Sequence, residues 1–206
     1  LEAQRDHEIF LIVADLHSLT TRPSKSEISE LPQHVRDIVL DLLSAGIDPE
    51  TSTIYLQSGV AAVYDLAILL SMVTPASSLQ EVEATKAMAK VAKLSEAEMS
   101  FGLLGYPVLQ AADILMARAE VVPVGGDNVA NVELARSVAE RFNAEYGEVF
   151  PLPKAVVSEV PLLPGVGNGG ASTKMSKSAG NGINLKDDPQ VVKDKLASLE
   201  GEQLQA

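Results

Sequence analysis

The sequence contains no cysteine and no tryptophan among its 206 residues, and only 4% of the residues are aromatic. Without thiols, the chain can form neither disulfide bonds nor thiolate metal sites. The few aromatic side chains leave no visible platform on which nucleic-acid bases could stack. Aliphatic and alanine side chains must therefore supply the core, and 46% hydrophobic residues are enough to build one.

Positive charge is also scarce, since 16 Lys and Arg residues stand against 28 Asp and Glu residues and give a formal net charge of −12. Non-specific binding to nucleic acid depends on many Lys and Arg side chains that neutralise phosphates. A broad electrostatic surface for nucleic acid is therefore not expected.

Long apolar segments are missing as well. The longest, residues 60–73, is interrupted by Asp65, and it is shorter than the roughly 20 apolar residues that cross a bilayer. No cationic N-terminal stretch precedes an apolar run and a small-residue cleavage site. We therefore expect no membrane association and a cytoplasmic location.

The first part of the chain has the pattern of a β-α-β unit. Residues 9–14 (IFLIVA) form a continuous apolar run, which is typical of a strand buried on both faces of a parallel sheet. Residues 21–29, rich in proline and serine, predict a loop. Residues 35–43 carry apolar side chains at helical spacing, and Gly46 follows at the position of a C-cap. A second short strand, residues 53–57, completes the unit.

The crossover of such a unit should be right-handed, and functional loops should leave the carboxyl ends of its strands. These loops begin near Asp15 and Gln57.

The rest of the chain alternates helical and extended patterns. Residues 61–115 read as mostly helical, residues 120–124 (EVVPV) as a buried strand that ends in Gly-Gly-Asp, and residues 132–142 as a helix. Residues 151–173 are rich in proline and glycine and predict an irregular segment. Residues 189–199 regain helical spacing.

These patterns together predict an α/β fold. We expect a Rossmann-like, doubly wound parallel sheet with a largely helical insertion at about residues 61–118. A mobile loop is expected at about residues 165–182.

Residues 174–178 (KMSKS) place two ammonium groups on this loop. Positioned cations that close over a triphosphate can stabilise the charge that develops when a nucleophile attacks the α-phosphate. A generic Lys-x-x-Lys is usually a solvated basic loop, but the intact pentapeptide is far more specific.

The pentapeptide is the signature of class I aminoacyl-tRNA synthetases, and other stretches resemble the tryptophanyl enzymes within that class. They are residues 12–20 (IVADLHSLT), 106–115 (YPVLQAADIL) and 122–127 (VPVGGD), the last leading to residues 133–143 (ELARSVAERFN). Their order and spacing match throughout. The resemblance covers essentially the whole chain, and it implies that residues 1–206 are part of a synthetase catalytic domain.

The resemblance implies a tryptophan pocket. Asp113 would accept a hydrogen bond from the indole N–H, which is a donor only, so that a buried acceptor selects tryptophan over phenylalanine. Tyr106 would form a wall of the pocket and contact the α-amino group, with His17 and Gln110 also lining the site. Other readings stay open at this point: a capping or ion-paired carboxylate for Asp113, a core side chain for Tyr106 and a structural histidine for His17.

The same resemblance assigns the signature to ATP. Lys174 and Lys177 would contact the leaving pyrophosphate and act in catalysis, while Met175, Ser176 and Ser178 would be further ATP contacts. Mg²⁺ would accompany the ATP without a dedicated protein cage. No metal-ligand spacing links the histidines of the chain, so no protein metal site is expected.

The nucleoside part of ATP is assigned to a different stretch. Gly125, Gly126 and Asp127 follow the strand at its carboxyl end, where the backbone can approach the ribose and a carboxylate can accept from its hydroxyls; a lone Gly-Gly-Asp is usually only a turn. Val160 falls where the family offers a backbone contact to adenine. Lys86 lies where the family often carries cations, and it could equally be a solvated surface lysine.

The sequence departs from the family pattern in three places. The His-x-Gly-His type motif that holds ATP phosphates would precede Leu1, and the helical anticodon-binding domain would follow Ala206, so neither is in the chain. We therefore expect that the chain as written does not complete tRNA charging. Asn128 stands where the family usually has glutamine, which predicts a water-mediated or lost contact with the tryptophan amino group.

The resulting hypothesis is ATP-dependent activation of L-tryptophan and its ligation to tRNA(Trp), the latter through regions mostly absent here, in a homodimer whose interface involves helices between residues 61 and 115. The rival hypothesis is a noncatalytic synthetase-like module or divergent paralogue that binds tryptophan or a protein partner. A tyrosyl relative disagrees with the Ala-Ala-Asp context of Asp113.

Overall fold

The computed structural model describes residues 1–20, 24–80, 82, 85–86, 89, 94–95, 98–157, 163, 165–166, 175 and 180–197. The chain divides into two compact units, Leu1–Val156 and Val157–Ala206. The first unit opens with a short 3-10 helix, η1 (Glu2–Arg5).

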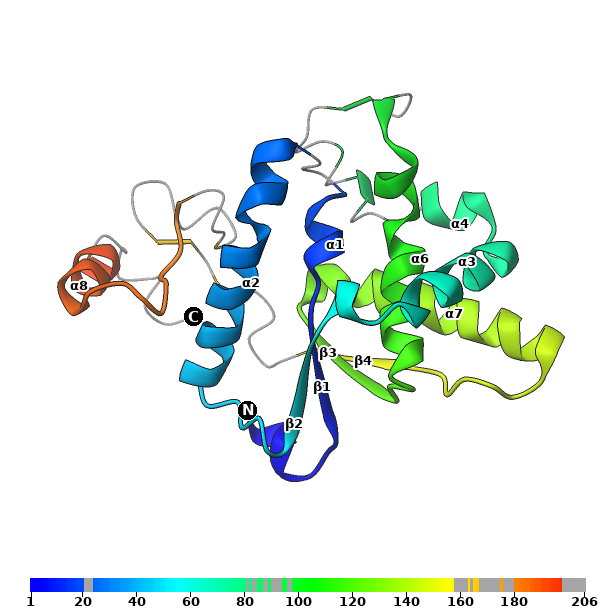
Figure 1. Ribbon diagram of the computed structural model, residues 1–206, viewed down its shortest axis with the longest axis horizontal. Helices are drawn as coiled ribbons and strands as arrows, with labels where there is room; N and C mark the ends of the chain where they lie inside the picture. The colour runs from blue at the N-terminus through cyan, green and yellow to red at the C-terminus, as the bar shows by residue number, and fades with distance from the viewer. Residues whose placement is uncertain are drawn as a thin grey trace. The chain divides into compact units, whose positions relative to one another are not determined.

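Parallel strands β1 (Ile9–Val13) and β2 (Ser52–Leu56) lie side by side (Figure 1), in a register that sets Ile9 opposite Ser52 and Val13 opposite Leu56. The strands expected at residues 9–14 and 53–57 are confirmed to within one residue. Because the two strands end level, the segments that follow them leave from the same edge of the sheet.

Those two segments are α1 (Asp15–Ser18) after β1 and the 3-10 helix η2 (Gln57–Gly59) after β2. The backbone N–H of Ser58 donates to Oδ1 of Asp15 at 3.0 Å. This bond ties the two segments together just beyond the strand ends.

Helix α2 (Lys25–Ser44) connects β1 to β2 and begins earlier than the sequence suggested. The loop expected at residues 21–29 is wrong for residues 25–29. Ser24 caps the helix by accepting from the backbone N–H of Glu27 at 3.3 Å. The Ser-x-x-Glu pattern of a capping box marks this start, and the proline and serine content of the segment concealed it.

The end of α2 agrees with the expectation for Gly46. This residue has a φ of 101°, and the N–H groups of Gly46 and Ile47 donate to the carbonyls of Leu43 and Leu42 at 3.1 Å each. This is a Schellman motif, in which a residue in the left-handed region satisfies the last carbonyls of a helix.

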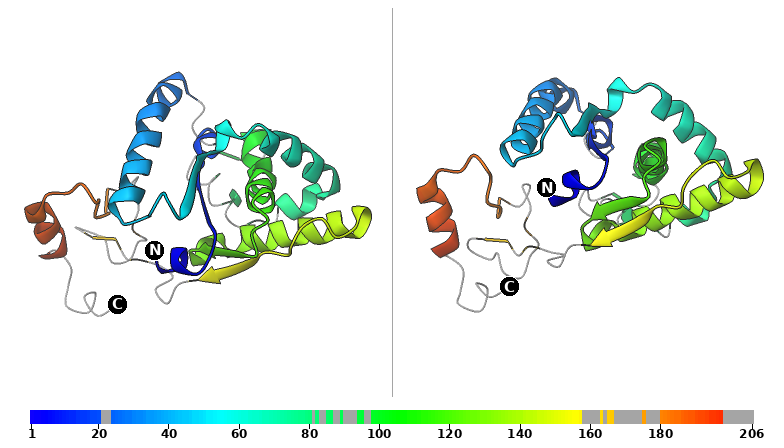
Figure 2. Two further views of the ribbon diagram at one scale, coloured as in Figure 1. Left: turned by 60° about the horizontal axis from the view of Figure 1, so that its bottom comes forward. Right: turned by 90° about the horizontal axis from the view of Figure 1, so that it is seen from below.

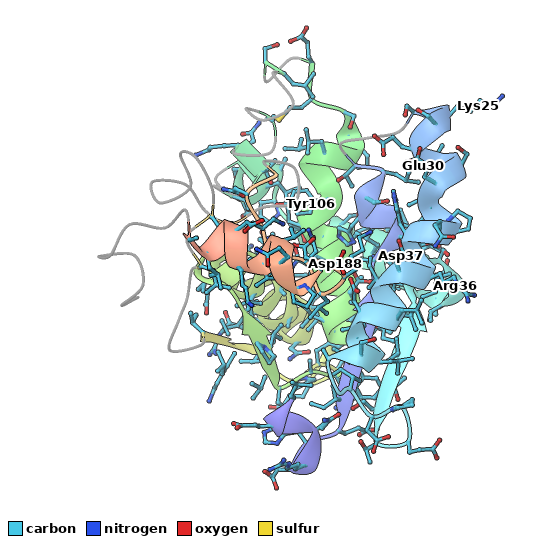
Figure 3. All side chains as sticks on the ribbon, turned by 90° about the vertical axis from the view of Figure 1, so that its left-hand side faces the viewer. Lys25, Glu30, Arg36, Asp37, Tyr106 and Asp188 are labelled. Carbon is cyan, nitrogen blue, oxygen red and sulfur yellow. The ribbon has the colours of Figure 1, made fainter. Side chains whose placement is uncertain are left out.

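Helix α2 covers one face of the β1–β2 pair, while α6 lies on the other (Figures 1 and 2). The charged side chains of α2, among them Lys25, Glu30, Arg36 and Asp37, are drawn in Figure 3. An α layer on each face of a parallel strand pair is the arrangement that a doubly wound α/β fold requires.

The main core lies between four helices, α3 (Ala62–Val73), α4 (Ala76–Gln80), α6 (Phe101–Met116) and α7 (Val129–Tyr146), which gather in one region of the unit (Figure 1). They confirm the helices expected at residues 61–115 and 132–142 for the part of the chain that is described. The core is almost entirely aliphatic, and its fully buried members include Val63, Leu70, Ala111, Leu115, Val132 and Ala135.

A second pair of strands is formed by β3 (Val121–Val124) and β4 (Lys154–Val157). The first was expected at residues 120–124. The second was not, because residues 151–173 were interpreted as irregular, and this interpretation is wrong for residues 154–157. A strand of four residues next to prolines is too short to show an alternation of apolar and polar side chains.

In the second unit, α8 (Pro189–Ala197) is held to the segment before it. Nζ of Lys195 donates to Oδ2 of Asp187 at 2.6 Å and to the carbonyl of Gly182 at 2.8 Å. The backbone N–H of Asn184 also donates to Oδ2 of Asp187, at 2.9 Å. The hydrogen bonds that Asp187 accepts from Asn184 and Lys195 hold its pKa below its usual range, and the bond from the backbone N–H of Asn184 is the largest cause.

No helix among the described residues is both long enough and apolar enough to span a bilayer.

We predict that Gly46→Ala lowers the free energy of unfolding by about 1–2 kcal/mol, because a Cβ is unfavourable in the left-handed region. Gly102→Ala is a matched control, since it replaces a helical glycine at which the nearest neighbour of a new Cβ would be Ser100 Oγ at 3.8 Å, and it should stabilise the protein slightly. Urea unfolding of both variants tests this, and equal effects would contradict it.

Candidate functional site

Polar side chains from three separate segments converge beyond the carboxyl ends of β1 and β2. His17 comes from α1, Gln57 from the first position of η2, and Tyr106 and Asp113 from α6. The level ends of the two strands bring the first two residues together, although 40 positions separate them in sequence.

Helix α6 presents the other half of the site. Tyr106, Gln110 and Asp113 follow each other at i, i+4 and i+7, which places them on one helix face. Tyr106 and Asp113 are 5% and 7% exposed, and Gln110 is half-buried. Figure 3 shows Tyr106 on this helix. The structure therefore brings together four of the residues assigned to the tryptophan pocket, three from α6 and His17 from α1.

Gln57 is the centre of the hydrogen-bond network. Its side-chain Nε2 lies 2.8 and 3.0 Å from the two carboxylate oxygens of Asp113 and 2.9 Å from Nδ1 of His17. Its Oε1 accepts from the backbone N–H of His17 at 3.4 Å. Nε2 of His17 in turn lies 3.4 Å from the carbonyl oxygen of Tyr106. Gln57 itself is 0% exposed.

Burial dominates the electrostatics of this cluster. It raises the pKa of Asp113 to about 7, against the opposing effect of the hydrogen bond from Gln57. Burial also lowers the pKa of His17, and it raises the pKa of Tyr55, on β2, with a smaller contribution from the charge of Asp113. Nδ1 of His17 is 3.6 Å from Oδ2 of Asp113, but both shifts favour the neutral forms, so we describe this contact as polar rather than as an ion pair.

Three buried polar atoms have no hydrogen-bond partner among the described residues: Oγ1 of Thr85, the hydroxyl of Tyr106 and Oδ1 of Asn131. Buried polar groups are nearly always satisfied in folded proteins. A hydroxyl of this kind on the face of α6 that carries Asp113 is suited to bind a polar group of a ligand.

The Gly-Gly-Asp stretch forms an exposed turn at the carboxyl end of β3. Gly125 caps the 3-10 helix η4 (Gly126–Asn128), and its carbonyl accepts from the backbone N–H of Asn128 at 3.0 Å. Oδ1 of Asn128 accepts from Nδ2 of the buried Asn131 at 3.2 Å. Asp127 is exposed in the same turn. Carboxylate and backbone groups are thus at the surface here.

The signature loop lies mostly outside the described residues. Val160, Lys174, Ser176, Lys177 and Ser178 all fall there. Met175 is described, and its backbone N–H donates to the carbonyl of Leu163 at 2.9 Å. Lys86 is described as exposed. Within the described ranges, no group of three or more His, Asp and Glu residues could hold a metal ion.

Gln57 is the functional candidate that the sequence did not assign. A signal was present, because it is the first residue after the second strand, at the end from which functional loops were expected to leave. Its partners could not be recognised, since Asp113 is 56 positions away in sequence.

Comparison with known proteins identifies the family of the chain. Residues 1–202 match the profile of the class I tRNA synthetases for tryptophan and tyrosine. The chain belongs to this family. The match spans both units and includes the signature pentapeptide.

The curated relatives are tryptophan–tRNA ligases. The chain is 52% identical over 199 residues to the enzyme of Treponema pallidum, with 97% of the chain and 58% of that protein covered. It is 46% identical over 183 residues to the enzyme of Thermotoga maritima, with 89% of the chain and 54% of that protein covered. The chain thus spans a little over half the length of these relatives.

Solved structures agree with the α/β fold of this family. The tryptophanyl-tRNA synthetase of Campylobacter jejuni, crystallised with ADP and tryptophan, is 39% identical and superimposes with a TM-score of 0.81, covering 97% of the chain and 59% of that protein. The enzyme of Mycoplasma pneumoniae is 30% identical, with a TM-score of 0.84 over 97% of the chain and 58% of that protein. The Rossmann-like class I fold expected from the sequence is confirmed.

Because the pKa of Asp113 is raised, we expect the free energy of unfolding to depend on pH. The folded state keeps this proton up to about pH 7, whereas an unfolded aspartate loses it near pH 3.9. The folded state therefore binds more protons in this window, and the free energy of unfolding contributed by Asp113 falls as the pH rises through it.

Asp113→Asn should remove this dependence, so the variant gains stability relative to the parent between pH 4 and pH 8, by an upper limit on the order of 4 kcal/mol. Urea unfolding at several pH values tests it, with the exposed Asp65→Asn as control. His17 contributes the opposite slope in both proteins, because its pKa is lowered. Parallel curves for parent and variant would contradict the prediction.

Proposed function

We propose that the protein activates L-tryptophan with ATP, forming tryptophanyl-adenylate and pyrophosphate, and transfers the amino acid to tRNA(Trp). The observation that carries this proposal is Asp113, a buried carboxylate held by Gln57 on both oxygens. The tryptophan–tRNA ligases that resemble the chain support it.

Selection of tryptophan would rest on the indole nitrogen. The indole nitrogen can donate a hydrogen bond but cannot accept one. An ionised carboxylate can accept hydrogen bonds but cannot donate one. A side chain without the N–H, such as phenylalanine, would exclude water from Asp113 without supplying a donor to it, and the hydrogen bond lost in this way disfavours the wrong substrate.

The α-amino group of the substrate would meet the hydroxyl of Tyr106, which has no other partner among the described residues. Gln110, on the same face of α6, would line the pocket between Tyr106 and Asp113. Asn128 would contribute less than a glutamine at this position, because it is shorter and its Oδ1 already accepts from Asn131.

Chemistry would occur at the α-phosphorus of ATP. The tryptophan carboxylate attacks in line, a bond forms between its oxygen and phosphorus, and pyrophosphate leaves with the bonding electrons. Lys174 and Lys177 stabilise the charge on the leaving group, with Met175, Ser176 and Ser178 as neighbouring contacts. Gly125, Gly126 and Asp127 approach the ribose, and Val160 offers its backbone to adenine. Mg²⁺, when bound with the ATP, would neutralise part of the charge of its phosphates.

The first test is tryptophan-dependent exchange of labelled pyrophosphate into ATP. We expect exchange by the protein, with Lys177→Ala lowering kcat by about 10²–10³-fold and Asp113→Ala lowering kcat/KM for tryptophan by about 10²-fold. Lys186→Ala, an exposed lysine in the second unit, is the matched control and should retain activity.

Absence of exchange would overturn the proposed activation step. If tryptophan still binds in calorimetry, the chain is either a synthetase-like binding module, which is the rival hypothesis, or an inactive fragment of the enzyme. Exchange with tyrosine but not with tryptophan would instead assign it to the tyrosyl branch.

We also propose that the protein is a homodimer and acts in the cytoplasm, where charged tRNA is used. Helix α3 supports the dimer, because Tyr64, Ile68, Leu69 and Met72 lie exposed on its surface, the last with 72% of its area accessible. Apolar side chains grouped in this way commonly mark protein interfaces.

The double substitution Ile68→Glu and Met72→Glu should therefore shift the protein from dimer to monomer in sedimentation analysis, because it places charge on the apolar surface. Arg36→Glu, on the charged side of α2 (Figure 3), is the control and should leave the mass unchanged. A parent protein that sediments as a monomer would refute the dimer.

A further inference from the structure

We propose that Gln57 positions Asp113 for recognition of the indole N–H and is therefore a specificity-determining residue of the pocket. This inference rests on the proposed function, because it concerns how tryptophan is distinguished from similar side chains. It is carried by the contacts of one fully buried amide with two other segments of the site.

The direction of the Gln57 amide follows from its partners. The backbone N–H of His17 can only donate, so the atom that faces it at 3.4 Å must be the amide oxygen. The NH₂ group then faces Asp113 and His17. The opposite orientation would set the amide oxygen against the carboxylate, and two acceptors repel each other.

The two protons of the Gln57 side-chain NH₂ are donated to different acceptors. One is shared between the carboxylate oxygens of Asp113, at 2.8 and 3.0 Å, and the other points to Nδ1 of His17, at 2.9 Å. Nδ1 is therefore an acceptor, and His17 carries its proton on Nε2, which faces the carbonyl of Tyr106 at 3.4 Å. In this tautomer, His17 cannot donate from Nδ1 to Asp113.

Asp113 is thus held by a neutral donor rather than by a cation. An amide orients the carboxylate without cancelling its charge, and a carboxylate has about four lone-pair directions, so capacity remains for a donor on a ligand. A hydrogen bond to an ionised acceptor is about twice as strong as one between neutral groups. Gln57 would therefore both aim the carboxylate and favour its ionised form against the effect of burial.

Loss of this amide should weaken recognition in a pH-dependent way. The bond from Gln57 opposes the rise in the pKa of Asp113 that burial causes, so its removal leaves a larger share of Asp113 protonated near neutral pH. The other titratable groups around the carboxyl are His17 on α1, Tyr55 on β2 and Tyr106 on α6. Burial lowers the pKa of His17 and raises the pKa of Tyr55.

The experiment compares L-tryptophan with 3-benzothienyl-L-alanine, in which sulfur replaces the ring N–H. Gln57→Met keeps the size of the side chain and removes its hydrogen bonds. We expect a rise in KM for tryptophan of about tenfold or more, little change in KM for the sulfur analogue, little change in kcat, and partial recovery of the tryptophan KM at pH 8.5. Gln33→Met, an exposed amide on α2, is the control.

Gln57→Glu keeps the test decisive if Gln57→Met does not fold, and a double variant tests the pair directly if it does. Gln57→Glu retains an acceptor for the backbone N–H of His17 but sets a second carboxylate against Asp113, so one proton is shared and recognition should weaken for tryptophan alone. In an Asp113→Asn background, Gln57→Met should no longer change the ratio of the two KM values, because the partner that it positions is gone.

Equal losses with both substrates, or no loss with tryptophan, would overturn the inference and leave Gln57 a structural residue. Failure of the proposed function gives a different result. If the parent binds both amino acids in calorimetry but catalyses no exchange, the proposed activation of tryptophan is refuted. The ratio of the dissociation constants of Gln57→Met for tryptophan and for the sulfur analogue then still tests the inference. If the parent does not bind tryptophan, both proposals fall.

Discussion

The parallel pairing of β1 with β2 is the constraint on which the site depends. Their register ends Val13 opposite Leu56, so the first turns after both strands begin at one edge. A shift of one residue would turn every side chain of one strand to the other face, and it would move Gln57 away from His17. The hydrogen bond from Ser58 to Asp15 reinforces the alignment. The ladder of backbone bonds between the two strands thereby sets the position of two polar side chains that no local sequence preference could bring together.

The helix that completes the site is also the most deeply buried one. The core side of α6 packs against α3 and α7 through side chains such as Ala111 and Leu115, which are fully buried. Tyr106 and Asp113 therefore sit on a support that has little freedom to move. Precise placement on a regular element rather than on a loop suits a residue that must discriminate between ligands by one hydrogen bond.

Much of this arrangement was readable from the sequence. The apolar run before Asp15, the periodicity that ends at Gly46 and the strand before Gly125 located β1, α2 and β3, because an apolar run or a helical period leaves a clear pattern along the chain. The start of α2 was missed because capping depends on single side chains, here Ser24 and Glu27. Strand β4 was missed because residues 151–173 are rich in proline and glycine, a composition that predicts an irregular segment. The resemblance to synthetases supplied Asp113 and Tyr106, but the role of Gln57 needed three-dimensional contacts. The assignments of Lys174, Lys177 and Val160 stay predictions, since these residues lie outside the described part of the chain.

The surroundings of Asp113 also have an optical consequence. Tyr55 is influenced by the charge of Asp113, Tyr106 contacts the ring of His17, and the chain itself contains no tryptophan. An indole bound at Asp113 would absorb further to the red than these tyrosines and would receive excitation energy from them. Because free tryptophan in water receives no such energy, the transfer would distinguish the bound ligand from the free one without any label or substitution.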